Sequence, residues 1–233
     1  MIRVASYNIR KSLGLDRKRN PLRILDVLNE IDADVVFLQE VDRRMGKRAS
    51  TLSPELIAKY TDYEAAEVAV REHSLGWHGN VILARKGMEI EKAWRIDLPV
   101  IEPRGAVAAD INLGGRSVRC VATHLGLLAR IRKQQVRKII TSLHDEPGDL
   151  PTIIAGDFNE WRNSESCIDL FSENYRSIDP EPSFHSALPV VALDRIIVSR
   201  DINFLKTSVH TSKKSKIASD HLPLWADISL PKP

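Results

Sequence analysis

Short apolar runs alternate along the chain with turn signals and with longer segments of helical periodicity. These runs predict strands over residues 2–9, 34–40, 80–85, 106–113, 117–125, 151–158, 193–199 and 222–229. Two runs, Val35–Leu38 and Ile153–Ala155, are continuously apolar, which is typical of strands buried on both faces. The run at 222–229 alternates, which indicates one packed face and one more polar face.

Helix starts are marked by a polar residue followed by proline. Asn20-Pro21 and Ser53-Pro54 each combine an N-cap with a proline in the first turn. A longer helix is predicted over 127–144, with one stripe formed by Leu128, Ile131, Gln135, Ile139 and Leu143. Alternating strands and helices favour an α/β fold of about ten short strands. We expect the 233 residues to form a single domain, 1–233.

The composition excludes some functions without selecting one. Lys and Arg total 34 and Asp and Glu total 31, so the net charge of +3 excludes a polycation that coats nucleic acid. Aromatic residues make up only 6%, which is few for a protein that grips single strands by base stacking. The basic residues nevertheless cluster in short runs at 17–19, 43–48, 130–138 and 213–216.

Cysteine usage and the apolar runs bear on the compartment. Cys120 and Cys167 lie among apolar residues and are predicted to be buried, reduced thiols, consistent with a reducing compartment. No apolar run reaches the roughly 18 residues of a membrane span. The first residues carry no signal-peptide pattern, so we expect a cytoplasmic protein.

Polar side chains recur where the predicted strands begin or end. They are Asn8, Glu40, His124, Asp157, Asn159, Asp194, Asp220 and His221. Each alone is explained equally well as a turn former or a strand-end cap. Ligands of α/β folds bind at strand ends, so the recurrence predicts a functional site there.

These residue types point to metal and phosphate chemistry. Glu40, Asn8 and Asp220 offer only oxygen ligands, which suits Mg²⁺ or Mn²⁺. Zinc is disfavoured because the histidines show no H-E-x-x-H pattern and the two cysteines lie far apart. An Asp194–His221 pair has the chemistry of an imidazole oriented by a carboxylate.

The remaining candidates suit a phosphate ester and a water nucleophile. Asp157 is a further carboxylate that is available to orient a water. Asn159, His124 and Arg104 are donors that suit an anionic oxygen. Together the residues predict metal-assisted hydrolysis of a phosphate ester by in-line attack of an activated water.

Six segments of the chain resemble the endonuclease/exonuclease/phosphatase superfamily. They occur in the family's order and are Ser6–Arg10, Leu38–Asp42, Thr123–Leu125, Gly156–Asn159, Leu193–Ile196 and Ser219–Pro223. The resemblance covers nearly the whole chain and is to the small bacterial metal-dependent hydrolases of the superfamily. It implies a four-layer α/β sandwich of two packed mixed β-sheets flanked by helices, related to pancreatic-type deoxyribonuclease.

The resemblance also implies a role for each metal and proton-transfer residue. Glu40 resembles the main metal ligand, with Asn8 and Asp220 nearby in the metal and water shell. His221 resembles the histidine that contacts the scissile phosphate, and Asp194 the residue that orients it. Whether His221 is a general base or an electrostatic stabiliser stays open.

Five further positions are assigned in the same way. Asp157 resembles the residue that aligns the attacking water, and Asn159 and His124 match phosphate-contacting positions. The histidine at 124 is as in pancreatic-type deoxyribonucleases, whereas abasic-site endonucleases usually have tyrosine. Arg104 and Asn80 lie in two more segments similar to the small bacterial hydrolases, and are weaker candidates for phosphate binding.

The motifs leave the substrate undecided, because loops set it in this superfamily. Leu38–Asp42 is more similar to the general bacterial and lipid-directed branches, and no long DNA-gripping insertion is present. We therefore predict a divalent-metal-dependent phosphodiesterase acting on phospholipid-like or nucleic-acid phosphodiesters, or on a small molecule. The alternatives are a DNA or RNA endonuclease or exonuclease and, less favoured because no expected residue is missing, an inactive binding module. Basic runs beside Glu40, His124 and Asp220 predict electrostatic contact with polyanions.

Overall fold

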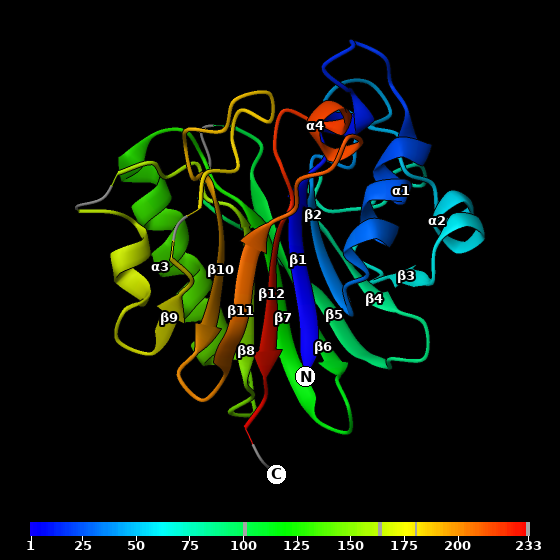
Figure 1. The fold of residues 1–233 in the computed structure, drawn as a ribbon. Helices are drawn as coiled ribbons and strands as arrows, with labels where there is room; N and C mark the ends of the chain where they lie inside the picture. The colour runs from blue at the N-terminus through cyan, green and yellow to red at the C-terminus, as the bar shows by residue number, and fades with distance from the viewer. Residues whose placement is uncertain (100–101, 163–164, 180, 232–233) are drawn as a thin grey trace.

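Two β-sheets packed face to face form the centre of the molecule (Figure 1). The computed structural model describes residues 1–99, 102–162, 165–179 and 181–231. The strands within these residues are β1 (Ile2–Asn8), β2 (Val35–Gln39), β3 (Tyr63–Ala65), β4 (Val81–Arg85), β5 (Ile90–Ile96), β6 (Gly105–Asn112), β7 (Ser117–His124), β8 (Thr152–Asp157), β9 (Tyr175–Ser177), β10 (Asp194–Ser199), β11 (Asn203–Val209) and β12 (Leu224–Ser229).

Both sheets are mixed, and each has one parallel pair near its middle. The first sheet has the order β11-β12-β1-β2-β4-β3 and the second β5-β6-β7-β8-β10-β9. The parallel pairs are β1 with β2 and β7 with β8, and the other neighbours are antiparallel. These central strands of the two sheets pack against one another.

Helices cover the outer faces of the two sheets. They are α1 (Pro21–Ile31), α2 (Pro54–Tyr60), α3 (Ala129–Asp145) and the short α4 (Ser215–Ala218), with 3₁₀ turns η1 (Arg10–Ser12) and η2 (Ile168–Phe171). Figure 1 shows α1 and α2 on one side of the sandwich and α3 on the other. This arrangement is the expected four-layer α/β sandwich, with two mixed sheets between layers of helix.

Successive side chains of the central strands point to opposite faces of the sheet, so each strand contributes to two apolar clusters. In β6, Val107 and Ala109 join the cluster between the sheets, whereas Ala106 and Ala108 face the cluster under α3. Every residue of β2 and β8 is buried. The continuously apolar runs therefore belong to strands packed on both faces, as predicted.

The predicted helix starts are confirmed, whereas the stripe on the long helix is partly wrong. Asn20 Oδ1 accepts a hydrogen bond from the Arg23 amide at 3.2 Å, and Ser53 Oγ one from the Leu56 amide at 3.3 Å. On α3, Leu128 is 59% exposed and Arg132 is buried in its place. Arg132 is accepted there because its guanidinium has a buried acidic partner, which is described below.

Two smaller expectations concern the cysteines and membrane spans. Cys120 and Cys167 are both buried and free, as predicted. Within the described ranges, no helix has the length and hydropathy needed to cross a membrane.

Candidate active site

Strand register brings the predicted polar residues to one end of the two sheets. In the first sheet, Asn8 pairs with the last residue of β2, so that Glu40 follows directly beside it. In the second sheet, His124 pairs with Asp157, and Asp157 with Asp194. Because β1 and β8 pack face to face, the two sets meet across the sandwich.

One hydrogen bond joins the two sheets at this end. Asn8 Nδ2 donates to Asp157 Oδ2 at 2.9 Å, and the Asn159 amide donates to Asp157 Oδ1 at 2.9 Å. Asp157 is 1% exposed. Burial raises the pKa of Asp157 to about 6; the charge of His221 opposes this shift, and the charge of Asp194 adds to it. This carboxyl group is held near the pH at which a side chain readily exchanges a proton.

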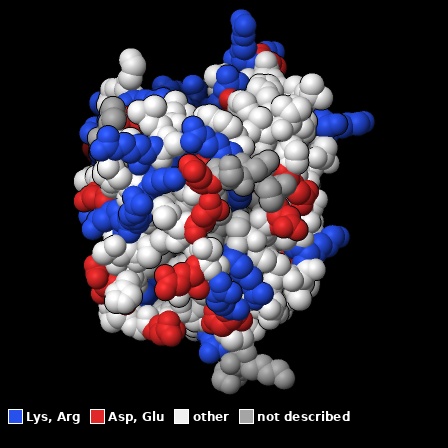
Figure 2. Space-filling model, turned by 90° about the vertical axis from the view of Figure 1, so that its left-hand side faces the viewer, with Lys and Arg blue, Asp and Glu red and all other residues white. Residues whose placement is uncertain are grey.

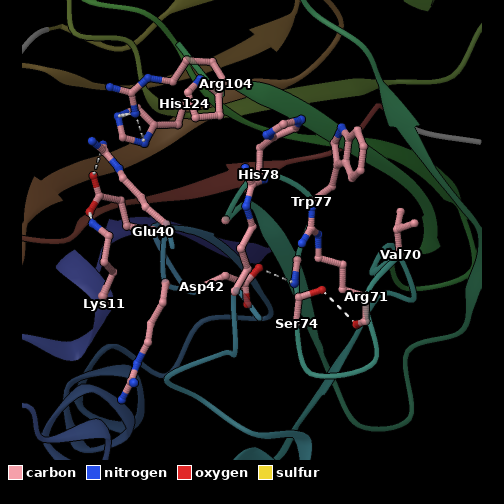
Figure 3. A pocket seen from close by; sticks show the side chains of 16 residues that line it. Lys11, Glu40, Asp42, Val70, Arg71, Ser74, Trp77, His78, Arg104 and His124 are labelled. Atoms are coloured by element: carbon pink, nitrogen blue, oxygen red, sulfur yellow. Dashed lines mark hydrogen bonds and ion pairs between the residues drawn. The ribbon is translucent and has the colours of Figure 1, made fainter. Parts of the chain in front are cut away.

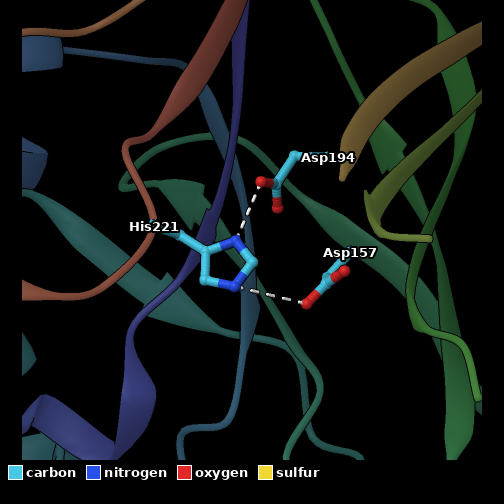
Figure 4. Close-up of side chains that lie close together, drawn as sticks. All are labelled: Asp157, Asp194 and His221. Atoms are coloured by element: carbon cyan, nitrogen blue, oxygen red, sulfur yellow. Dashed lines mark hydrogen bonds and ion pairs between the residues drawn. The ribbon is translucent and has the colours of Figure 1, made fainter. Parts of the chain in front are cut away.

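His221 lies between two carboxylates (Figure 4). Its Nδ1 is 2.9 Å from Asp194 Oδ2, and its Nε2 is 3.7 Å from Asp157 Oδ2. Burial by itself lowers the pKa of His221, but Asp194 and Asp157 outweigh it and raise that pKa to about 10. The arrangement therefore favours an imidazolium whose orientation is fixed by Asp194.

Glu40 stands at the mouth of this group, just after β2. Its carboxylate forms ion pairs with Lys11 Nζ and, at 3.4 Å, with Arg44 Nη2. Burial disfavours the ionised form, but the hydrogen bond and charge of Lys11 outweigh this and lower the pKa of Glu40. Asp220 is paired in the same way with Arg10, at 3.2 Å between Nε and Oδ2.

Two sets of side chains have donor atoms suited to a metal ion. Candidate ligand atoms of Asp157, Asp194 and His221 all lie within 4.8 Å of one another, although the imidazole of this set is already hydrogen-bonded to Asp194. The other set is Glu40, Asp220 and Asn8, and its donors are oxygens only. Each acid of this second set already pairs with a cationic side chain, so each carboxylate accommodates a neighbouring positive charge.

Arg104 and His124 form a compact basic pair beside Asp157. Arg104 Nη1 is 2.7 Å from His124 Nε2, which in turn is 3.3 Å from Asp157 Oδ2. Burial, and then the charges of Arg104 and His221, lower the pKa of His124 well below its usual value. The imidazole of His124 is therefore neutral, and Arg104 carries the positive charge.

The two predicted asparagines differ in how they are engaged. Asn159 follows β8 in the left-handed region, with φ of 50°, and donates from Nδ2 to the Leu125 carbonyl at 2.9 Å. Asn80 is fully buried, and its Nδ2 donates to the carbonyls of Gly105 at 3.0 Å and Trp77 at 3.3 Å. Asn80 thus joins the turn before β4 to the first residue of β6, which favours a positioning role over direct contact with phosphate.

Sequence reasoning missed several residues that support the site. Lys11 belongs to a basic pair directly after Asn8-Ile9, and that adjacency was the available signal. Ser183, whose hydroxyl donates to Asp194, comes from a distant loop and gave no signal. Arg132 and Glu160 form a buried ion pair, at 3.0 Å, that holds the segment after Asn159. Arg132 was not predicted because the other basic residues of its helix indicate an exposed face.

A pocket opens beside Glu40, Arg104 and His124 (Figure 3). It holds about 600 Å³ of empty space, a volume that includes its open mouth. Its other lining residues are Lys11, Asp42, Arg43, Arg44, Arg48, Val70, Arg71, Ser74, Gly76, Trp77, His78, Gly79 and Pro103. The candidate site is therefore continuous with a larger, basic hollow.

Fold and site together define an α/β-sandwich phosphoesterase scaffold, with carboxylates, a histidine and basic side chains at one end. The chain belongs to the Endonuclease/Exonuclease/phosphatase family, whose model matches residues 5–221. Members of this family are hydrolases that act on phosphoesters and typically use divalent metals.

Similar proteins cover the chain almost completely. The uncharacterized protein YbhP of Escherichia coli (strain K12) is 27% identical over 251 residues, which cover 98% of this chain and 96% of YbhP. Among solved structures, an endonuclease/exonuclease/phosphatase from Bacteroides vulgatus has a TM-score of 0.80 at 20% identity, covering 98% of both chains. The human Nocturnin catalytic domain with a bound sulfate anion has a TM-score of 0.75 at 21% identity, covering 98% of this chain and 93% of that one. These two structures match nearly the whole of this chain and therefore support the same fold over almost its full length.

Proposed function

We propose that this protein is a divalent-metal-dependent phosphodiesterase. The observation that carries the proposal is the continuous set of contacts from Asn8 through Asp157 and His221 to Asp194, beside the carboxylate of Glu40. Family membership supports a hydrolase acting on phosphoesters. A binding module would not need a buried histidine held between two buried carboxylates, so catalysis is favoured over the inactive alternative.

Glu40, Asp220 and Asn8 fit the proposed cation by the chemistry of their donors. All three supply oxygen, which suits Mg²⁺ or Mn²⁺, and both acids now face positively charged side chains. When bound, such an ion supplies positive charge to the phosphate and lowers the pKa of a coordinated water.

The other side chains act on the phosphate and on the water. His221, fixed by Asp194, faces the phosphate as a positively charged donor. Asp157 orients the attacking water for in-line displacement, and its raised pKa of about 6 suits a group that takes up a proton near neutral pH. Arg104, with His124 beside it, and the amide of Asn159 stabilise the charge on the phosphate oxygens.

The central test is hydrolysis of bis(p-nitrophenyl) phosphate with and without Mg²⁺ or Mn²⁺. We expect activity that is lost in EDTA and reduced at least roughly 100-fold by Glu40→Gln and by His221→Gln. The exposed Glu67→Gln and His73→Gln are the matched controls and should retain activity. Equal activity in the site variants and the controls, or no metal-dependent hydrolysis at all, would contradict the proposal.

A nuclease is the second candidate function, and the observation that favours it is the set of arginines around the site mouth. Plasmid nicking measured beside hydrolysis of phospholipid vesicles separates the two substrate classes. Metal-dependent nicking without lipid release assigns the protein to the nucleases, and the reverse assigns it to the phospholipid-directed enzymes. We expect the compartment to be cytoplasmic, which fractionation of the producing cells tests directly.

A further inference from the structure

The pocket carries much more positive charge than one phosphate requires. Beyond Lys11 and Arg104 it is lined by four arginines: Arg43, Arg44, Arg48 and Arg71. We call the space bounded by these four side chains and the wall of Trp77 and His78 the arginine pocket. Figure 3 shows Trp77, His78 and Arg71 on the far side of the pocket from Lys11.

This charge is not neutralised by the acids of the pocket. Asp42 is buried, and its two oxygens accept hydrogen bonds from the backbone amides of Leu75 at 2.9 Å and Gly76 at 3.1 Å. Glu40 is occupied by Lys11 and Arg44. Across the ranges that the structure describes, Arg43, Arg48 and Arg71 form no ion pair. Arg43, Arg48 and Arg71 thus line one hollow without a close ion pair among the described residues, although the charge of Arg48 is felt by Asp42.

Buried donors of the pocket also lack partners. Arg104 is 6% exposed, and within the described residues its Nε makes no hydrogen bond, although both of its terminal nitrogens are engaged. The same holds for Trp77 Nε1 and His78 Nδ1. Because all three atoms are buried even with the hollow open, a ligand there would meet the guanidinium groups and not these atoms.

The electrostatic environment of His78 is consistent with this reading. Burial, followed by the charge of Arg48, lowers the pKa of His78; the charge of Asp97 opposes this shift, and Arg71 adds a smaller lowering effect. The imidazole therefore stays neutral at the pH at which the four arginines are charged.

We propose that the arginine pocket binds a second phosphate of the substrate, so that the physiological substrate carries one phosphoester at the metal end and another phosphate in the pocket. The proposal rests on the proposed phosphodiesterase function, whose substrate class it narrows. Arginine is the side chain that best matches phosphate, because its planar group donates two parallel hydrogen bonds. A nucleic-acid backbone, a phosphorylated lipid headgroup and a small bisphosphate share this chemistry.

Two chromogenic substrates that differ only in the second phosphate test the proposal. They are the p-nitrophenyl ester of thymidine 5′-phosphate and the same ester with an additional 3′-phosphate. We expect the wild-type protein to prefer the 3′-phosphorylated ester at least roughly tenfold in kcat/KM. In Arg48→Gln/Arg71→Gln the preference should fall to within about twofold, with the change mainly in KM.

A matched variant and a binding measurement complete the design. Arg17→Gln/Lys18→Gln removes two exposed cations outside the pocket and should keep the preference. Calorimetry without metal should show thymidine 3′,5′-bisphosphate binding the wild type at least about tenfold more tightly than thymidine 5′-monophosphate, and this difference should vanish in Arg48→Gln/Arg71→Gln.

The outcomes separate this proposal from the one it rests on. If neither ester is cleaved, the proposed function fails, while calorimetry still tests the pocket. If both esters are cleaved and bound equally well by the wild type, the second-phosphate proposal is overturned and the phosphodiesterase stands. A preference that survives Arg48→Gln/Arg71→Gln in a protein that melts like the wild type also overturns it. Phosphorylated vesicles, oligonucleotides and small bisphosphates can then be compared as sources of the second phosphate.

Discussion

At the scale of single residues, Gly156 shows how closely backbone packing and the site are connected. A Cβ atom at this position would lie 1.8 Å from the Thr123 carbonyl oxygen of the neighbouring strand. That contact is with backbone, so no side chain can turn away to relieve it. The residue directly precedes Asp157, and the parallel register of β7 and β8 at this point aligns His124 with Asp157.

We therefore expect Gly156→Ala to destabilise the protein by about 1–3 kcal/mol or more, because the added methyl group forces the two strands apart. Phosphodiesterase activity should fall with it, since Asp157 moves relative to His124. Urea unfolding gives the stability and the chromogenic assay gives the activity. Gly126→Ala is the control, because its added Cβ would meet nothing closer than 3.5 Å. Equal stability of the two variants would contradict the packing argument.

The clustering of the residues at strand ends was predictable, because neighbouring strands of a sheet place their end residues side by side. Once Asn8 and Glu40 are recognised as ending neighbouring parallel strands, their proximity follows. The pairing of Asp194 with Ser183 was not predictable, because Ser183 reaches it from a loop whose path depends on contacts with Val191 and Leu222. The orientation of Lys11 toward Glu40 was not predictable, because Lys11 lies in a left-handed turn, with φ of 55°, that no glycine in the sequence indicates.

At the scale of elements, the pairing of β1 with β12 includes one well-formed cross-strand ion pair. Arg3 lies opposite Asp227 in the antiparallel register, with Nε 2.7 Å from Oδ1 and Nη2 3.0 Å from Oδ2. The guanidinium also stacks over Trp225, 4.4 Å from its ring centroid. The hydrogen bond from Arg3 lowers the pKa of Asp227, and burial only partly opposes it.

A carboxyl group whose pKa is lowered by folding contributes to the free energy of unfolding at pH values above its unfolded pKa of about 3.9. This contribution is lost as the pH falls through the lower pKa of the folded state. We expect Asp227→Asn to cost about 1 kcal/mol at pH 7, since Arg3 is partly exposed and solvent screens the pair. At about pH 3 the cost should be clearly smaller. Urea unfolding at both pH values is the measurement.

The control for this pH dependence is Asp62→Asn, at an exposed carboxylate for which the described residues provide no cationic partner. It should leave stability unchanged at both pH values. A loss for Asp227→Asn that is as large at pH 3 as at pH 7 would show that side-chain shape, and not the ionised pair, accounts for its contribution.

Whether a strand was predicted from the sequence depends on its position in the sheet. All eight predicted strands were found, and all eight lie in the interior of a sheet. The missed ones are β3, β5, β9 and β11, which are the four edge strands of the described sheets. An edge strand contacts one neighbour and exposes much of its length, so β5 and β11 carry charged residues such as Lys92 and Lys206 in place of apolar runs.

At the scale of the whole molecule, a net charge of +3 conceals an uneven distribution. Figure 2 shows Lys and Arg gathered in the upper part of the face that includes α3. Arg130, Lys133, Arg137 and Arg162 line a shallow groove there. By contrast, the run at 213–216 is less available than its sequence indicates, because Lys214 pairs with Asp26 at 2.9 Å. Tertiary pairing decides which basic runs remain free, and sequence spacing cannot show it.

This groove leads to the last prediction, which concerns polyanion binding. We expect the protein in EDTA to bind a fluorescein-labelled oligothymidine weakly, with an affinity that falls steeply as salt rises. Arg130→Gln/Lys133→Gln/Arg137→Gln should weaken binding and reduce the slope of log K against log salt by about 2, since each lost phosphate contact contributes roughly 0.7 on a single strand. The control, Arg17→Gln/Lys18→Gln/Lys59→Gln, removes the same charge from other parts of the surface. An equal change of slope in both variants would show that net charge accounts for the effect. An unchanged slope in the α3 variant would show that the α3 face does not bind the oligonucleotide.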